Sequence, residues 1–459
     1  MARATEFRGD QTVRPNRRDL LVMTVASAVP GASGFARRRT LQPSGDKTGR
    51  VDTARLQAAA AAGGVWALQR GAWSLSRQVT WSHHDSGFVC LDGVAVITML
   101  TGAGQFDQAT YANAFGTNQC GFYCLGFDRP VIEGLSVMLE ANPGFRTATA
   151  IAVRNSLNPT LKRVEISGFN YTHGGAILLD TVTGGKVHDI YGHDCVATAY
   201  LADTQVTLIV VDGNRVGAVG SRHIDFDNIR GENIRVARGL IGTGAAQFQV
   251  NQSDVLTLAG TGYAGHTVRR LTAVNVGEPI DCWTDGNTFS DIVIRKPLVR
   301  GISFKWGARN NTVRKATIDQ TTLAAVGIFS FAHNPSITDR TGDGNVIADV
   351  TVTNAGALWA TEIFGNSAEP AFYVHGSNGA KDNFDPGHTR FINCVASGSA
   401  AAFTYVFGCQ GGGPGNLFEG DGAGYATAFA IDTGTHLATW KQRGAVQANV
   451  AVRKARAGT

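Results

Sequence analysis

The feature that most restricts the fold of this chain is a short phrase that recurs along it. Each copy starts beside a Gly or Asn, continues with a β-branched or aromatic residue and two or three polar ones, and ends in a short apolar alternation. Corresponding points recur at intervals of about 20 to 45 residues, which is typical of stacked solenoid coils. The copies are PTLKRVEISGF (159–169), GGKVHDIYGHD (184–194), GSRHIDFDNIRG (220–231), GHTVRRLTAVNVG (265–277), GNTFSDIVIRKP (286–297), NNTVRKATIDQ (310–320), DGNVIADVTVTNAG (343–356) and GHTRFINCVASG (387–398).

A second set of apolar phrases lies between these copies, so strand and turn alternate in constant order. This order predicts one coil of a parallel β-helix per repeat, with neighbouring coils ~4.8 Å apart. At the coil corners, Asn310 and Asn311 suit a turn because Asn tolerates left-handed backbone. The phrases are GGAILLD (174–180), EPIDCWTDG (278–286), RGISFKWG (300–307), VGIFSFAHN (326–334), EPAFYVHGSN (369–378) and ATAFAIDTG (426–434).

The composition agrees with one large β-rich domain. The chain has 57 Gly and 12 Pro among 459 residues, and it is 43% hydrophobic and 17% charged, which favours a well-buried fold with many tight turns. No Pro/Ser-rich linker or charged spacer divides it. We expect a β-helix domain over residues 37–440, including its N-terminal cap, and a C-terminal tail over 441–459.

The segment VDTARLQAAAAAGGVWALQRGAWSLS predicts the cover that a solenoid needs at its open end. Asp52 can cap a helix that runs to about Ala62, Gly63 and Gly64 stop it, and the following residues predict strand, turn and strand. This opening, together with the coils from about residue 50 to 435, resembles the pectin-lyase-like superfamily. The resemblance implies an all-β, single-stranded, right-handed parallel β-helix of about ten coils with a short N-terminal capping helix.

Residues 1–36 resemble a twin-arginine export signal. In NRRDLLVMTVASAVPGASGFA, Arg17 and Arg18 precede an apolar run, and small residues follow up to a cleavage point after Ala36. The run is too short to span a bilayer; the alternative is a basic N-terminus with a short buried helix. We expect a periplasmic or secreted protein with no membrane association after signal removal. The segment carries five Arg and three acidic residues, so the formal net charge of +5 becomes +3, too weak and dispersed to indicate nucleic acid.

The seven cysteines do not indicate a metal site. Cys120 and Cys124 could pair in an oxidising compartment, whereas Cys195, Cys282 and Cys394 lie in strand-like runs as small apolar residues. No Cys or Cys/His cluster has the spacing of a zinc site, so we predict no structural metal.

Outward residues of the second set of phrases form the candidate site. If those phrases occupy the same sheet in successive coils, the outward residues stack into a column, because side chains alternate across a strand. His333, just past VGIFSF, could overhang it; the register of that phrase is ambiguous, because Phe329 and Phe331 could equally be the buried pair. The predicted outward residues are Asp281 with Trp283, Ser303 with Lys305, and Tyr373 with His375.

An acid, a Lys, aromatic residues and His residues in one column suit an anionic sugar. Lys305 or Arg309 could neutralise a uronate carboxylate, and His333, His375 or Tyr373 could move the proton. Trp283 and Arg300 are the predicted substrate-binding residues, with Trp283 as a platform for a sugar ring. Each also has an ordinary structural alternative: a solvated Lys or Arg, a loop His bonded to backbone, or a Trp packed under a loop.

A hydrolase interpretation starts from IDCWTDGN followed by RGISFKWG. The layout is similar to the polygalacturonase-type order of an Asp-Asp-Cys strand followed one coil later by Gly-His-Gly-Ile-Ser. Asp281 and Cys282 match, as does the Gly-Ile-Ser of residues 301–303, but Ile280 replaces the other Asp and Arg300 replaces the His. Hydrolysis needs an acid and a base, for which Asp281 with Asp285 could serve. Calcium could replace the basic neutraliser if these two carboxylates converge, and we otherwise expect no cofactor.

Two further motifs have alternative explanations. DNFDPGHT resembles the Asp-Pro-His element of alginate epimerases and related lyases, with Asp385, Pro386 and His388 present and Gly387 inserted. The acidic pairs in HIDFDNIR (Asp225, Asp227) and YGHDC (His193, Asp194) favour ordinary turn or surface roles.

The sequence therefore predicts an exported carbohydrate-active enzyme with a polysaccharide or oligosaccharide as its partner. A polysaccharide lyase that cleaves a uronate-containing glycan by β-elimination is favoured, because the column holds basic residues and one outward carboxylate within a strand. A glycoside hydrolase or transglycosylase on the same fold is one alternative, and a non-catalytic glycan-binding β-helix is another. The protein could be a monomer or a homo-oligomer.

Overall fold

A computed structural model divides the chain into residues 1–38 and a compact unit over residues 39–459. The predicted export segment, residues 1–36, lies outside the described residues. The structure describes residues 39–100, 112–113, 116–117, 119–140, 148–169, 175–197, 206–212, 220–237, 253–329, 342–356, 369–376, 386–398, 405–410, 415–423, 427–432 and 439–442.

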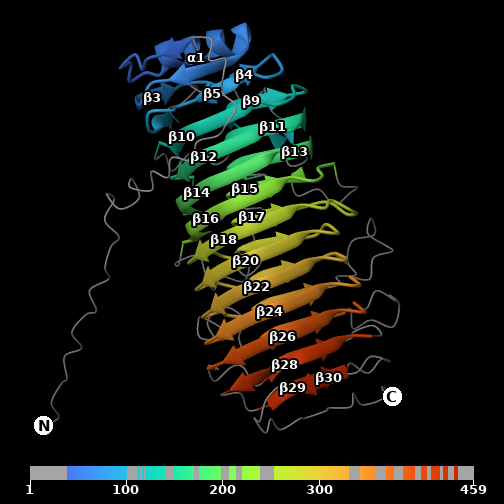
Figure 1. Cartoon of the computed structure of the whole chain (residues 1–459). Helices are drawn as coiled ribbons and strands as arrows, with labels where there is room; N and C mark the ends of the chain where they lie inside the picture. Colours follow the sequence, from blue (N-terminus) through green and yellow to red (C-terminus); the bar gives the residue numbers. More distant parts are fainter. Residues whose placement is uncertain are drawn as a thin grey trace, which may run out of the picture. The chain divides into compact units, whose positions relative to one another are not determined.

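Two long parallel sheets build the unit (Figure 1). The first sheet contains β1 (Thr40–Leu41), β2 (Val65–Leu68), β3 (Gly71–Leu75), β5 (Gly87–Val89), β6 (Ala95–Met99), β10 (Val131–Leu139), β12 (Thr160–Ser167), β14 (Lys186–Ala197), β16 (Asp225–Val236), β18 (Thr267–Val274), β20 (Thr288–Arg295), β22 (Thr312–Asp319), β24 (Val346–Thr353), β26 (Arg390–Ser397), β28 (Leu417–Ala423) and β30 (Thr439–Gln442).

The second sheet runs in the order of the chain through β4 (Val79–Trp81), β9 (Gln119–Leu125), β11 (Ala148–Leu157), β13 (Ile177–Thr183), β15 (Ile209–Val211), β17 (Leu256–Leu258), β19 (Ile280–Cys282), β21 (Ile302–Phe304), β23 (Val326–Phe329), β25 (Phe372–His375), β27 (Tyr405–Gln410) and β29 (Thr427–Asp432). A small antiparallel pair, β7 (Ala112–Asn113) with β8 (Gly116–Thr117), stands apart.

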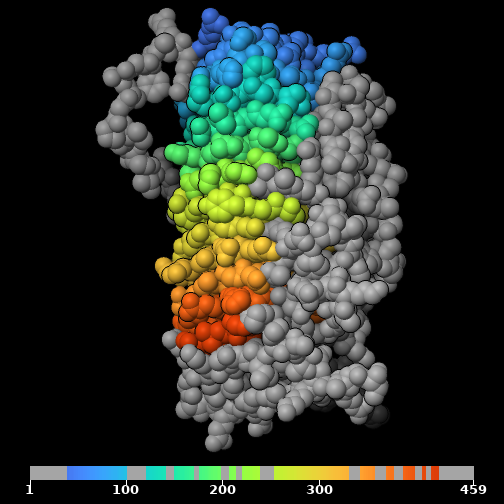
Figure 2. Space-filling model, turned by 90° about the vertical axis from the view of Figure 1, so that its right-hand side faces the viewer, coloured from blue at the N-terminus to red at the C-terminus, as the bar shows by residue number. Residues whose placement is uncertain are grey.

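Each coil contributes one strand to each sheet, and each strand pairs with the equivalent strand of the next coil. The pairs from β10 with β11 to β28 with β29 make ten coils, and β9 and β4 belong to two earlier ones, so the described second-sheet strands mark twelve coils where the sequence predicted about ten. Figure 2 shows the described parts of successive coils as bands of colour in chain order. The fold is a single-stranded, right-handed parallel β-helix, as the sequence predicts.

A left-handed residue within the first-sheet strands explains the adjacent polar residues of the repeated phrase. In β22, Arg314 and Lys315 are both exposed between buried Val313 and Ala316, because Lys315 has φ of 56° and shifts the inward alternation by one residue. Equivalent residues stack in register, since each coil bends at the same place. They are Arg163, Asp189, Asn228, Arg270, Asp291, Lys315, Asp349 and Asn393, all with φ between 53° and 56°.

Buried asparagines line one inner corner of the coils. The Asn287 N–H donates to Asn311 Oδ1 at 2.9 Å, and the Asn311 N–H donates to Asn345 Oδ1 at 3.0 Å. All three side chains also donate to backbone carbonyls, so the polar corner is satisfied without water. Asn310 has φ of 55°, which confirms its predicted left-handed corner. Asn311 is instead one of the three buried asparagines that form a ladder of hydrogen bonds from coil to coil.

The helix α1 (Arg50–Ala62) packs against β3 and β4, as expected for a cap at the N-terminal end. The prediction that Asp52 caps it is wrong, because Gly49 occupies the N-cap position without a side-chain hydrogen bond. The buried Asp52 carboxylate instead accepts the N–H groups of Ser44 at 2.8 Å and Ser74 at 3.0 Å. The predicted stop is confirmed, because Gly63 is the C-cap with φ of 70°.

Inward Val, Ile, Leu and Phe side chains form one core that runs through the coils. All seven cysteines are buried free thiols, so Cys120 and Cys124 do not pair. Among the described residues, no helix combines the length and apolar character needed to cross a membrane.

Candidate active site on the second sheet

The register of the second sheet confirms the predicted outward column. Asp281 on β19 aligns with Ser303 on β21, Ser303 with Gly327 on β23, and Gly327 with Tyr373 on β25. Their strand neighbours belong to the core: Ile280, Cys282, Ile302, Phe304, Val326, Ile328, Phe372 and Val374.

The structure also decides the register of β23. Val326 and Ile328 are the inward pair, so Phe329 lies on the outward side, where its ring meets Tyr373 and His375 at centroid distances of 5.9 Å and 6.3 Å. His333 lies outside the described residues.

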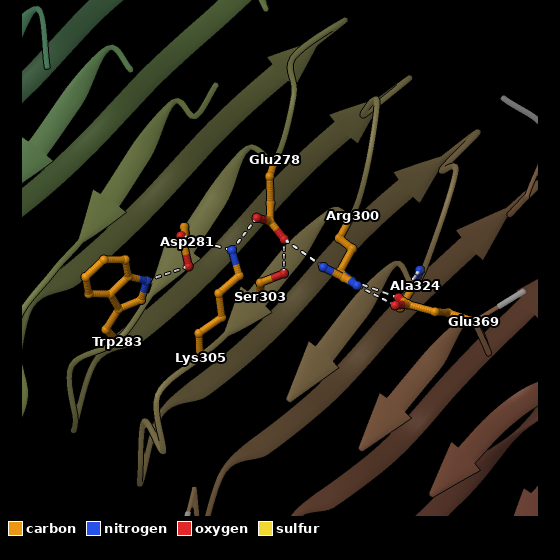
Figure 3. Close-up of polar contacts among 8 residues, drawn as sticks. All are labelled: Glu278, Asp281, Trp283, Arg300, Ser303, Lys305, Ala324 and Glu369. Carbon is orange, nitrogen blue, oxygen red and sulfur yellow. Dashed lines mark hydrogen bonds and ion pairs between the residues drawn. The ribbon is translucent and has the colours of Figure 1, made fainter. Parts of the chain in front are cut away.

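Lys305 is the centre of a buried ionic cluster. Its Nζ donates to Glu278 Oε2 at 2.5 Å and to Asp281 Oδ2 at 3.1 Å, as Figure 3 shows. Those two carboxylate oxygens are therefore no more than 5.6 Å apart, the sum of the two distances. The Ser303 hydroxyl donates to the other Glu278 oxygen. The ammonium group of Lys305 is thus already paired twice.

A third buried carboxyl, Asp254, lies one coil earlier. It is 1% exposed, and Thr257, the residue aligned with Asp281, donates its hydroxyl to Asp254 Oδ2 at 2.6 Å. Among the described residues, Asp254 Oδ1 has no hydrogen-bond partner.

Burial and neighbouring charges shift the pKa values of Asp254, Asp281 and Lys305 in this cluster. Burial, followed by the charges of Asp281 and Glu278, raises the pKa of Asp254 well above its usual range. Burial also raises the pKa of Asp281, but Lys305 opposes the rise and the pKa is about 6. Burial alone lowers the pKa of Lys305, yet Asp281 and Glu278 together raise it above its usual value.

Arg300 extends the cluster toward later coils. Its guanidinium forms a two-point ion pair with Glu369, with Nε to Oε2 at 2.8 Å, and its Nη1 lies 3.8 Å from Glu278 Oε1. The same group stacks over the Phe329 ring at 4.4 Å. Glu369 also accepts the Ala324 N–H at 3.2 Å (Figure 3). Arg300 therefore contacts three coils besides its own, those of β19, β23 and β25, and its charge is engaged within the protein.

Aromatic side chains border the cluster. The Trp283 Nε1–H donates to Asp281 Oδ1 at 2.9 Å, and the Trp283 ring meets the Trp306 ring edge-on at 6.0 Å. Tyr373 and His375 are half-buried with ring centroids 5.4 Å apart. Burial lowers the pKa of His375, so its imidazole is neutral at neutral pH.

Two of the remaining predicted residues, Asp285 and Arg309, lie at coil corners. Asp285 Oδ1 accepts the backbone N–H of Arg309 at 2.8 Å, one coil on. Asp385 lies outside the described residues, and His388 is exposed before β26, in the other sheet.

The residues of the two acidic pairs form outer-face ion pairs: Asp225 with His188, Asp227 with Arg270, and His193 with Asp194 and Glu165.

Sequence reasoning missed Glu278, Glu369 and Asp254. All three precede their strands, where strict alternation does not yet apply. A usable signal was present, because both glutamates stand in a Glu-Pro pair that opens a second-sheet phrase. No group of three or more His, Cys, Asp or Glu side chains in the described ranges is arranged to hold a metal ion.

Comparison with known proteins identifies the fold. No protein-family model matches the chain, and no curated protein matches it. Among solved structures, a PL6 alginate lyase in complex with a trisaccharide is similar over 87% of this chain and 86% of its own, with 11% identity and a TM-score of 0.52. The catalytic domain of a GH87 alpha-1,3-glucanase in complex with nigerose covers 94% of this chain and 70% of its own, with 13% identity and a TM-score of 0.47.

The A-module of the mannuronan C-5 epimerase AlgE6 from Azotobacter vinelandii covers 86% of this chain and 94% of its own, with 14% identity and a TM-score of 0.43. All three are carbohydrate-active enzymes on parallel β-helices. What they share with this chain is the fold, the right-handed parallel β-helix.

Proposed function

We propose that the chain is a carbohydrate-active enzyme that hydrolyses a polysaccharide, with proton transfer centred on Asp281. The observation that carries the proposal is the outward Asp281 carboxylate, which is held by Lys305 and Trp283 and has a pKa of about 6. A group that exchanges protons in catalysis works best with a pKa near the working pH. The similarity to a PL6 alginate lyase supports a carbohydrate-active enzyme and does not distinguish hydrolysis from elimination.

Hydrolysis of a glycosidic bond needs two carboxyls in different protonation states. Asp281, with a pKa of about 6, is largely ionised at pH 7, whereas burial and the neighbouring carboxylates raise the pKa of Asp254 well above its usual range. Asp281 therefore supplies the proton acceptor. Glu278 and Asp254 are both fully buried, so we assign them the positioning and electrostatics of Lys305 and Asp281 rather than contact with substrate.

Elimination from a uronate is the second candidate function. It needs a positive group to neutralise the uronate carboxylate and a base to take the C–H proton. The neutral imidazole of His375, beside Tyr373 on the same outward face, could act as the base. Lys305 and Arg300 are each already paired with carboxylates, which makes them weaker neutralisers and places elimination behind hydrolysis.

Product analysis on a panel of neutral and acidic polysaccharides tests the proposal. Hydrolysis predicts new reducing ends without the ultraviolet absorbance of an unsaturated uronate, whereas elimination predicts both signals together. Binding with no change in chain length would instead indicate a non-catalytic glycan-binding β-helix. The last outcome would overturn the enzyme proposal, and the absorbance would move it to a lyase.

A further inference from the structure

Trp306 has a backbone conformation that is costly for its side chain. Its φ is 54°, in the left-handed region, which a bulky residue rarely adopts. The other left-handed non-glycine residues of the described chain are Asp, Asn, Arg, Lys, Gln, Thr and His, so Trp306 is the one with a large aromatic ring among the described residues. The next residue, Gly307, is also left-handed, with φ of 69°.

The conformation directs the Trp306 ring toward the candidate site. Trp306 directly follows Lys305, and its ring lies at 67° to that of Trp283, with centroids 6.0 Å apart. The Trp283 indole is fixed in turn by its hydrogen bond to Asp281. Both rings are half-buried, so part of each surface is accessible. The two rings form an aromatic corner next to Asp281.

We propose that Trp306 is a specificity-determining residue, which together with Trp283 forms a stacking corner for one pyranose ring of a neutral glycan. This inference rests on the proposed function. Ligand sites for uncharged molecules combine aromatic walls with a few fixed polar groups, and Asp281 supplies such a group here. Strained backbone is kept where the side chain it presents has a function.

The charges of the cluster favour a neutral sugar over a uronate. Four carboxyls, Asp254, Glu278, Asp281 and Glu369, face two cations, Lys305 and Arg300. Even without Asp254, three carboxylates outnumber two cations, so the cluster has no surplus positive charge. A carboxylate on the sugar ring would meet like charge at the aromatic corner.

The test uses the full chain, its Trp fluorescence and two variants at Trp306. The probes are neutral hexasaccharides of gluco, manno and galacto configuration with α and β linkages, and hexagalacturonate. We expect at least one neutral hexasaccharide, and not hexagalacturonate, to change the fluorescence. In Trp306→Gly the dissociation constant should rise about tenfold, while Trp306→Phe keeps most of the affinity.

Three further readouts separate this inference from the proposed function and from a structural role. Trp306→Gly relieves the left-handed strain, so its melting temperature should stay within about 2 °C of the parent protein. On the polysaccharide that the enzyme degrades, KM should rise with kcat little changed, because stacking binds substrate and transition state alike. Trp66→Phe alters a half-buried Trp in the first coil and should change neither KM nor kcat.

Unchanged affinity and KM in Trp306→Gly would overturn the inference. If the parent enzyme still releases reducing ends, the proposed function would stand. Preferred binding of hexagalacturonate, or no response to any neutral hexasaccharide, would overturn it as well. If the parent binds a neutral hexasaccharide but cleaves no polysaccharide, the proposed function fails and the stacking corner stands.

Discussion

Replacement of Lys305 by Met tests the charge balance of the site. Met keeps most of the apolar stem of the side chain but removes the ammonium group that contacts Glu278 and Asp281. The side chains of Lys305, Asp281 and Glu278 are 11%, 7% and 0% exposed, so water cannot replace the lost partner well. Two carboxylates would then remain close together in a buried site.

The expected loss of stability follows from the geometry. At contact distances of 2.5 Å and 3.1 Å, each attraction amounts to about 5–7 kcal/mol before desolvation at an effective dielectric constant of about 20. The cost of burying the ammonium group offsets much of this sum. Removal of one partner from a buried ion pair typically costs about 3–5 kcal/mol, which we expect for the unfolding free energy at pH 7.

The loss of unfolding free energy in Lys305→Met should depend on pH. Without Lys305, the pKa of Asp281 rises, because the cation that favours its ionised form is gone. A carboxyl whose folded pKa is raised destabilises the protein above that pKa and ceases to do so once it is protonated. The loss should therefore be smaller at pH 5 than at pH 7.

Urea denaturation of the parent and Lys305→Met proteins at both pH values measures the difference. Lys315→Met is the matched control, because Lys315 is 73% exposed and lies 3.9 Å from Asp291, so we expect a change within about 0.5 kcal/mol. A loss below about 1 kcal/mol at pH 7, or an equal loss at both pH values, would refute the reasoning about the buried cluster.

Three other predictions follow from particular contacts. Asn311→Ala should lower the unfolding free energy by about 2–3 kcal/mol in urea denaturation, because it leaves the buried Asn287 N–H without its acceptor. An unchanged denaturation midpoint would show that this hydrogen bond does not stabilise the fold. Gly301→Ala should lower the melting temperature, because the added Cβ would lie 2.6 Å from the Ala325 carbonyl oxygen; equal or higher stability would show that the strand has room to shift. The pH profile of kcat/KM should fall on the acid side with a midpoint near 6, as protonation removes the Asp281 carboxylate; a flat profile between pH 5 and 7 would count against Asp281 as the base.

The fold could be predicted from the sequence because its repeat restricts the backbone strongly. Inward apolar residues alternate within each strand, and the adjacent polar residues, such as Arg314 and Lys315, mark the left-handed bend of each coil. Local capping was harder to predict. Asp52 has the residue type and position of an N-cap, yet its carboxylate turns to Ser44 and Ser74 because their N–H groups need buried acceptors.

The candidate site could be predicted only in part. Alternation along the strands placed Asp281 and Tyr373 on one outward face, since register follows from the buried residues. It could not place Glu278 or Asp254, which precede their strands. Nor could it show that Lys305 is already ion-paired, because that depends on a rotamer directed toward the preceding coil. This pairing changes the chemistry that the site favours.

The central claim is that Asp281 transfers protons in polysaccharide hydrolysis. The most direct test is the rate of reducing-end release by the Asp281→Asn variant compared with Asp291→Asn, which alters an exposed carboxylate of the first sheet. We predict that Asp281→Asn lowers kcat by about 10²–10⁴-fold with its melting temperature retained, and that Asp291→Asn stays close to the parent rate. Equal rates for the two folded variants would contradict the claim.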